Sequence, residues 1–140
     1  MPNSSTQPKA RRRGAALVEF AFVVPILFLL VFGLIEFSRM AMVYHVITNA
    51  AREGCRQAVL PGATASNVTT VVNSALNDGK VTSSSATVVI TPSNITSLDT
   101  GTPISVRVTV NYSAVSWIPS PDFLTNKLLQ AECVMLREAK

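Results

Sequence analysis

Reactive and charged side chains are scarce in this sequence of 140 residues. It holds one His and two Cys, which are too few ligands for an ordinary zinc or iron–sulfur centre. Charged residues make up 14% of the chain and aromatic residues 6%, and so low a charged fraction is unusual for a cytosolic domain. We therefore expect no metal and no cofactor, and the length excludes a large two-domain enzyme.

The excess of positive charge lies at one end of the chain, although the formal net charge is +4. Residues 15–140 hold eight Lys or Arg and eight Asp or Glu, so this part is neutral. The excess comes from four residues ahead of it, which are Lys9, Arg11, Arg12 and Arg13. A nucleic-acid-binding domain carries its positive charge over a folded surface. We therefore expect no nucleic-acid partner.

One long hydrophobic run follows this basic segment. Residues 1–14 are typical of a cytoplasmic basic leader. Residues 15–35, AALVEFAFVVPILFLLVFGLI, contain a single ionisable side chain, that of Glu19. A helix of this length covers roughly 30 Å, which is the thickness of the hydrocarbon core of a bilayer. The run therefore predicts a transmembrane helix.

A cleaved secretory signal is the main alternative for residues 15–35. The hydrophobic region of a signal is shorter, and no A-x-A cleavage site followed by a loop appears after Ile35. The basic leader precedes the span, whereas Glu36 and Arg39 follow it with mixed sign. The positive-inside rule then places the N-terminus in the cytoplasm and the C-terminal domain outside.

The hydrophobic pattern continues after the span with a helical period. Residues 36–60 predict an amphipathic extension of the helix, which ends at Pro61 and Gly62. Its apolar stripe consists mostly of small residues that suit close packing: Met40, Val43, Ile47, Ala50, Ala51, Gly54 and Ala58.

Residues 61–140 predict an extracytoplasmic α+β domain. Between Ala63 and Thr100, 19 of the 38 residues are Ser, Thr or Asn. A short helix is expected there, with Ser66 as its N-cap and Gly79 as its stop. Together with the extended first helix, it would pack on a small antiparallel sheet.

Alternating apolar residues predict the strands of this sheet. The first covers Ala86–Thr91, and the second presents Ile104, Val106, Val108, Val110 and Tyr112 on one face. The third would present Leu129, Ala131, Cys133 and Met135, although residues 124–137 also fit a helix.

The boundary between leader and span carries the most specific motif. Gly14 and Ala15 come directly after the basic cluster, and Glu19 and Phe20 follow inside the apolar run. A carboxylate in a transmembrane helix costs about 2.5–3.5 kcal/mol, so Glu19 is a candidate functional residue. The alternative is that its side chain reaches the lipid headgroups from the start of the helix.

These residues resemble the cleavage motif of type IV prepilins, in which a prepilin peptidase cuts after Gly and Glu is the fifth residue of the mature chain. Glu19-Phe20 is similar to the tight-adherence, or Flp, branch. The stretch RRGAALVEFAFVVPILFLLVFGLIEFSR, with Ala50-Ala51-Arg52-Glu53-Gly54, resembles TadE-like pilus-assembly proteins, which are pseudopilins or minor pilins.

The resemblance implies cleavage after Gly14 and a place in the bacterial inner membrane. The partners that it implies are other pilin or pseudopilin subunits, the prepilin peptidase and the pilus assembly machinery. It also implies that the Glu19 carboxylate pairs with the new α-amino group of a neighbouring subunit's Ala15. The alternative is a signal-anchored envelope protein that never polymerises and binds a ligand with its outer domain.

The two cysteines and the isolated histidine complete the candidate residues. Cys55 and Cys133 would lie in an oxidising compartment, which favours a disulfide, although two buried free thiols are the alternative. His45 has no second His or acidic cluster on its helix, so we expect no metal or catalytic role. Asn67 and Asn94 match glycosylation sequons. No nucleophile or phosphate-loop motif is present, and we expect no enzyme.

Overall fold

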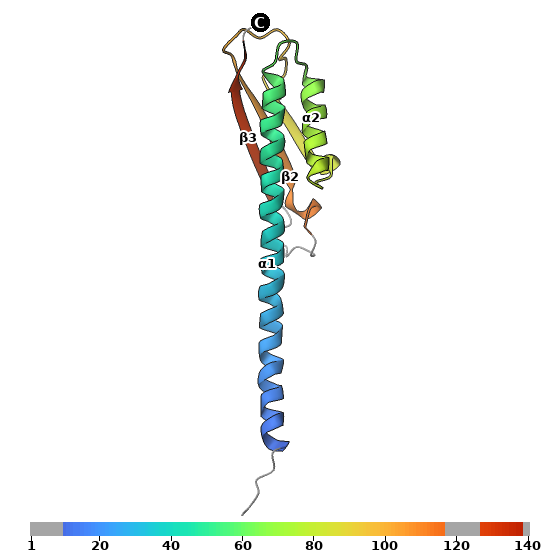
Figure 1. Cartoon of the computed structure of the whole chain (residues 1–140), viewed down its shortest axis with the longest axis vertical. Helices are drawn as coiled ribbons and strands as arrows, with labels where there is room; N and C mark the ends of the chain where they lie inside the picture. Colours follow the sequence, from blue (N-terminus) through green and yellow to red (C-terminus); the bar gives the residue numbers. More distant parts are fainter. Residues whose placement is uncertain (1–9, 117–126, 139–140) are drawn as a thin grey trace, which may run out of the picture. The chain divides into compact units, whose positions relative to one another are not determined.

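The computed structural model describes residues 10–116 and 127–138, with side chains from residue 14 onward. Its chain divides into two compact units, residues 1–35 and residues 36–140. The elements in order (Figure 1) are α1 (Ala10–Ala58), α2 (Ala65–Asp78), a 3-10 turn (Ser83–Ser85), β1 (Ala86–Thr91), β2 (Pro103–Asn111), a second 3-10 turn (Tyr112–Ala114) and β3 (Leu128–Leu136). The predicted α+β class, with an N-terminal candidate membrane helix, is confirmed.

Within the described residues the strands form a three-stranded antiparallel sheet in the order β1-β2-β3. Val108 of β2 lies opposite Val88 of β1 and Ala131 of β3. The bounds predicted for β1 are confirmed, and so is the third strand. The alternative helix over 124–137 is wrong for residues 128–136, because a strand there satisfies the backbone groups along the second edge of β2.

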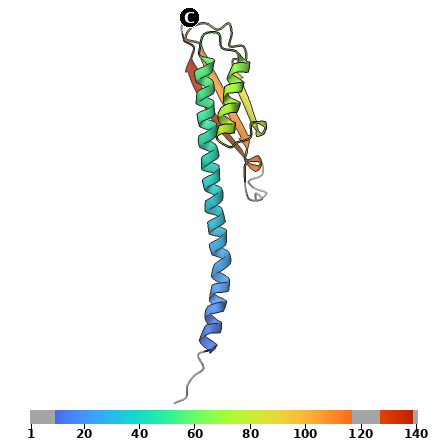
Figure 2. The same cartoon turned by 45° about the vertical axis from the view of Figure 1, so that its right-hand side comes forward.

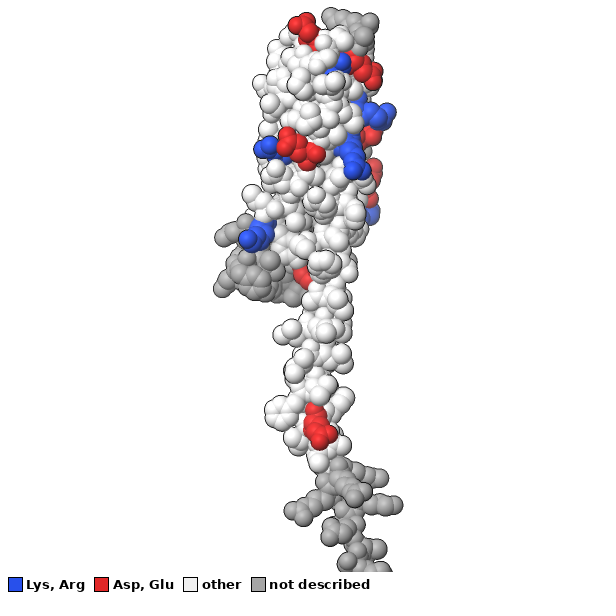
Figure 3. Space-filling model, turned by 90° about the vertical axis from the view of Figure 1, so that its left-hand side faces the viewer, with Lys and Arg blue, Asp and Glu red and all other residues white. Residues whose placement is uncertain are grey.

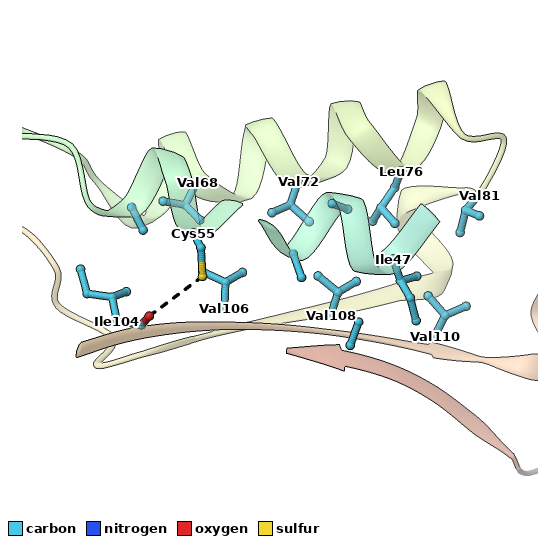
Figure 4. Packing of buried hydrophobic residues seen from close by; sticks show 14 of the residues in the cluster. Ile47, Cys55, Val68, Val72, Leu76, Val81, Ile104, Val106, Val108 and Val110 are labelled. Atoms are coloured by element: carbon cyan, nitrogen blue, oxygen red, sulfur yellow. Dashed lines mark hydrogen bonds between the residues drawn. The ribbon is translucent and has the colours of Figure 1, made fainter. Parts of the chain in front are cut away.

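The second part of α1 and the whole of α2 cover one face of this sheet (Figures 1 and 2). The predicted apolar stripe of α1 is buried or part-buried throughout. Figure 4 shows the aliphatic core between the layers, which includes Ile47, Val68, Val72, Leu76, Ile104, Val106, Val108 and Val110. Tyr112 is also buried, but it lies in the turn that follows β2 rather than in the strand.

The start of α2 differs from its prediction by two residues. Thr64, in extended conformation, is the N-cap, and its side chain accepts a hydrogen bond of 3.2 Å from the backbone N–H of Asn67. Ser66 lies already inside the helix, where it cannot serve that role. The end at Gly79 is confirmed, since Gly79 is the C-cap and its N–H donates to the Ala75 carbonyl at 3.2 Å.

Close packing explains Gly79 better than its backbone conformation does. Its φ of −78° is open to any residue. A Cβ at this position would lie 2.4 Å from Cγ1 of Val46 in α1. Gly79 therefore stands where the end of α2 meets α1, and a side chain would hold the two apart.

Gly54 has the same role in the middle of the layers. A Cβ there would lie 2.5 Å from Cγ2 of Val72 in α2 and 3.1 Å from Cγ1 of Val106 in β2. Both valines are fully buried. The absence of a side chain at Gly54 is therefore what lets α1 approach α2 and β2 together.

The ends of α1 also differ from their predicted places. The helix begins at Ala10, inside the segment predicted as leader, and ends at Ala58 rather than Leu60. After it, Ala63 donates its N–H to the Leu60 carbonyl at 3.2 Å, and Gly62 takes a φ of +76°. This turn requires a residue in the left-handed backbone conformation, which glycine adopts without strain.

Gly54→Ala should destabilise the domain. Overpacking costs about 1–3 kcal/mol and alanine regains about 1 kcal/mol of helix propensity, so we expect a net loss of about 1 kcal/mol. Urea unfolding of the full chain in detergent, followed by circular dichroism, measures this loss. The control Asn49→Ala changes an exposed position of α1 and gains propensity without a clash.

A second substitution tests the steric cause. Val72→Ala in the Gly54→Ala background should cost less than the two single losses added together, since the shortened side chain makes room for the new methyl group. A Gly54→Ala variant as stable as the natural chain would contradict the close approach.

Candidate functional site

The apolar part of α1 exposes its side chains to the surroundings. From Gly14 to Ile35 every residue is exposed except Val24, which is half-buried. Phe22 is 74% exposed and Leu29 75%. So large an apolar surface requires apolar surroundings, because soluble proteins seldom expose patches of more than a few hundred Å². The structure thus supports anchoring by a single membrane span near the N-terminus.

The exposed apolar part of α1 ends near residue 35, whereas the candidate membrane helix, by length and hydropathy, runs from Gly14 to Ala58. A helix of 45 residues would cover nearly 70 Å, far more than a bilayer core. From Val43 onward the stripe of α1 is buried against α2 and the sheet. That part has its apolar partner within the protein and needs none from lipid.

Glu19 is the one acidic or basic residue between positions 14 and 35. In Figure 3 the described part of this segment is accordingly almost free of charge colour, whereas acidic and basic side chains gather on the second unit. The Glu19 carboxylate is exposed and makes no hydrogen bond or ion pair with any residue that the structure describes. Phe20 beside it is 65% exposed. Both are therefore available to an outside partner.

Gly14 occupies an open position in α1, next to Ala15. A Cβ at Gly14 would meet nothing within 4 Å, and the same holds for Gly33 further along the helix. The fold therefore places no steric demand on Gly14, in contrast to Gly54 and Gly79. Any demand for a small residue at position 14 comes from outside the chain.

A polar cluster that the sequence analysis did not assemble lies directly after the apolar run. The Glu36 carboxylate accepts hydrogen bonds from the Tyr112 hydroxyl and the Ser116 hydroxyl, which follow β2. Arg39, one turn along α1, is 8% exposed and donates its Nε–H to the Val115 carbonyl at 3.1 Å. The cluster thus attaches the first turn of α1 in the second unit to the turn after β2.

The pKa of Tyr112 reflects the burial of this cluster. Its pKa is raised to about 12, first by burial and then by its hydrogen bond to the Glu36 carboxylate. A signal for the cluster was present in the sequence, because Glu36 and Arg39 stand three residues apart where the apolar run ends. Their partner turn is 76 positions away, and no local pattern joins the two.

The two cysteines, separated widely in the sequence, lie together in the structure. Cys55 is fully buried, and its thiol donates a hydrogen bond of 2.8 Å to the Cys133 carbonyl. Both are free thiols. Burial, and then the hydrogen bond with the Cys133 side chain, raises the pKa of Cys55 to about 12. The predicted neighbourhood is present, and the predicted disulfide itself stays a prediction.

The other candidate side chains do not converge. His45, Asn67 and Asn94 are exposed on separate parts of the second unit. Glu132 of β3 is bound by Arg107 of β2 at 2.9 Å, and this ion pair lowers the pKa of Glu132. Within residues 10–116 and 127–138, no group of three or more His, Cys, Asp and Glu side chains could hold a metal ion. Asp122 lies outside the described residues.

Tyr112→Phe should remove part of the pH dependence of stability. A tyrosine in the unfolded chain loses its proton near pH 10, whereas folded Tyr112 keeps its proton to about pH 12. Its contribution is therefore complete below pH 10 and is lost as the pH rises to 12. The variant lacks this loss, and near pH 7 it should be less stable by about 1–2 kcal/mol.

Urea unfolding between pH 7 and pH 12 measures both effects. Tyr44→Phe is the matched control, because Tyr44 lies on α1 with half of its surface exposed. It should stay within about 0.5 kcal/mol of the natural chain. Parallel pH profiles for Tyr112→Phe and the natural chain would contradict the role of the cluster.

The comparison with protein families gives a match that includes the exposed apolar part of α1. A family model described as "TadE-like protein" matches residues 14–56, about a third of the chain. No curated protein and no solved structure gives a match. The matched range begins at Gly14, contains Glu19 and Phe20, and ends just after Cys55. Residues 14–56 are therefore similar to a TadE-like domain, and this match supports a relation to Tad pilus proteins.

Proposed function

We propose that this chain is a pseudopilin or minor pilin that takes part in the assembly of a tight-adherence, Flp-type pilus. Residues 15–35 anchor it in the bacterial inner membrane, with the N-terminus in the cytoplasm and the second unit outside. A prepilin peptidase cleaves it after Gly14. The observation that carries this proposal is the TadE-like match, which begins at the residue where cleavage would occur.

The open position of Gly14 supports a role as a processing site. A peptidase must bring its catalytic groups close to the backbone that it cuts, and a side chain at the scissile residue obstructs this approach. The chain itself leaves free space around Gly14. Cleavage there removes all four cationic side chains of the leader and gives Ala15 a new α-amino group.

Glu19 supports a role in subunit contact. It lies four residues after Ala15, about 6 Å along the helix, where a carboxylate in lipid has little access to water. An ammonium group from a neighbouring subunit would offset the cost of burying that charge. The absence of a partner for Glu19 among the described residues leaves the carboxylate open for this contact.

The size of the second unit favours a minor role in the fibre. Residues 36–140 form an α+β unit with its own core, which is larger than a subunit consisting of little more than a helix. A protein that is anchored but never polymerises would keep its leader. The mature N-terminus therefore separates the two functions directly.

Gly14→Leu should leave an uncleaved chain, about fourteen residues longer than the mature natural protein. N-terminal sequencing and intact mass measurement of protein from cell envelopes decide this. Gly33→Leu is the matched control, because it lies on the same helix with the same open surroundings, and it should still begin at Ala15. A natural protein that retains its arginine-bearing leader would refute the processing.

Glu19→Gln removes the charge and keeps the size of the side chain. We expect the same or a larger amount in the membrane, because the uncharged side chain inserts more easily. Incorporation into sheared fibres should fall by at least about tenfold, since loss of one partner leaves the other charge buried alone. Quantitative immunoblots of membrane and fibre fractions measure both.

Leu17→Ala is the control for Glu19→Gln, because Leu17 is also exposed on this helix and is uncharged. It should change neither fraction by more than about twofold, an expectation based on its surface position. Normal incorporation of the Glu19→Gln protein would instead mean that the carboxylate serves only to reach the headgroups.

A further inference from the structure

The contact between Cys55 and Cys133 joins the two ends of the second unit. Cys55 lies in the last turns of α1, and Cys133 lies in β3, 78 positions later. The Cys55 thiol is 2.8 Å from the Cys133 carbonyl oxygen and 4.0 Å from that of Ile104 (Figure 4 shows the latter contact). The thiol is thus held over the place where β2 and β3 pair.

The side chain of Cys133 points to the same side of the sheet as this thiol. Cys133 lies opposite Val106 in the register of β2 and β3, and Val106 belongs to the buried face. On β3, the inward residues alternate with exposed ones, and Cys133 belongs to the inward set. The two side chains therefore lie on the same side of β3, between α1 and the sheet.

We propose that Cys55 and Cys133 form an intramolecular disulfide in the mature protein. The proposal goes beyond the assembly role, and it rests on the proposed function in one respect, since it requires the second unit to lie outside the cytoplasm. Disulfides persist in that oxidising compartment and are rare in the cytosol.

The bond forms by exchange with the disulfide of an envelope thiol oxidase, a chemical class of oxidant that such compartments contain. The Cys133 thiol, which is more exposed than Cys55, loses its proton and attacks a sulfur of the oxidase to give a mixed disulfide. The Cys55 thiol then loses its proton and attacks the Cys133 sulfur. Two electrons pass to the oxidase, whose two sulfurs leave as thiols and take up two protons.

Folding controls the access to this reaction. Buried Cys55, whose pKa is raised to about 12, is a poor nucleophile once α1 lies on the sheet. The exchange is therefore fastest while the domain is still closing. Once formed, the bond encloses α2, β1 and β2 in one covalent loop, and it links α1 to the last strand of the sheet.

Counting thiols in the natural full-length protein tests the proposal. Envelope membranes are dissolved in SDS without reductant and treated with a maleimide carrying a polyethylene glycol chain. We expect no mass addition before reduction and two additions after it. The Tm of the oxidised chain in detergent should exceed that of the reduced chain by at least about 10 °C, because the loop is long. Cys133→Ser, as control, should melt at one Tm with or without reductant.

The purified, reduced chain provides a test that does not depend on location. With oxidised glutathione it should lose two protons and both thiols, remain monomeric and retain no glutathione. A retained glutathione or a linked dimer would overturn the proposal. So would two labelled thiols in the natural envelope protein, provided that the second unit is shown to lie outside.

A reporter separates this result from a failure of the proposed function. Ser84 is exposed in the turn before β1. Ser84→Cys, in a Cys55→Ser and Cys133→Ser background, should react with a membrane-impermeant maleimide on intact spheroplasts. If it reacts while the natural thiols stay reduced, the disulfide is refuted and the orientation stands. If it is protected, the orientation is refuted and the glutathione experiment alone decides the disulfide.

Discussion

Apolar surface without a partner inside the chain is the constraint on which the other features depend. Residues 14–35 of α1 expose their hydrophobic side chains, and water would oppose that exposure strongly. A lipid bilayer satisfies it over a matching length. A neighbouring subunit with the same surface would satisfy it as well. Within such surroundings the Glu19 carboxylate is the costly group, and in the proposed function an ammonium group of a neighbouring subunit would offset this cost.

In the second unit, the apolar surface of α1 is covered by other elements of the same chain. The stripe of α1 after residue 36 has the same helical period as an amphipathic helix in any soluble protein, and α2 and the sheet cover it. Two glycines make this cover possible by removing side chains where the layers touch, Gly54 against Val72 and Gly79 against Val46. Gly14 differs from both, since no atom of the described residues lies within 4 Å of a Cβ placed there. The contrast separates two glycines that packing requires from one on which the described residues place no steric demand.

Polar contacts at residues 36–39 and at residue 55 attach the part of α1 that lies in the second unit to the turn after β2 and to β3. Near residue 36, Glu36 and Arg39 bind the turn that follows β2. Near residue 55, the Cys55 thiol contacts the backbone of β3. Both contacts lie within the second unit, and they hold the two ends of its part of α1 to the strands and the turn after β2.

The sequence by itself determined the class of fold, the candidate span, the strand faces and the TadE-like region. These rest on local periodicity and composition, which depend on neighbours a few residues apart. Only the tertiary structure decided the N-cap at Thr64, the strand over residues 128–136 and the cluster around Glu36. The first depends on backbone geometry, the second on the free edge of β2, and the third on a turn 76 positions away. The sequence left a disulfide between Cys55 and Cys133 and two buried free thiols open, and the position of the buried Cys55 thiol against the backbone of β3 follows from how the layers pack.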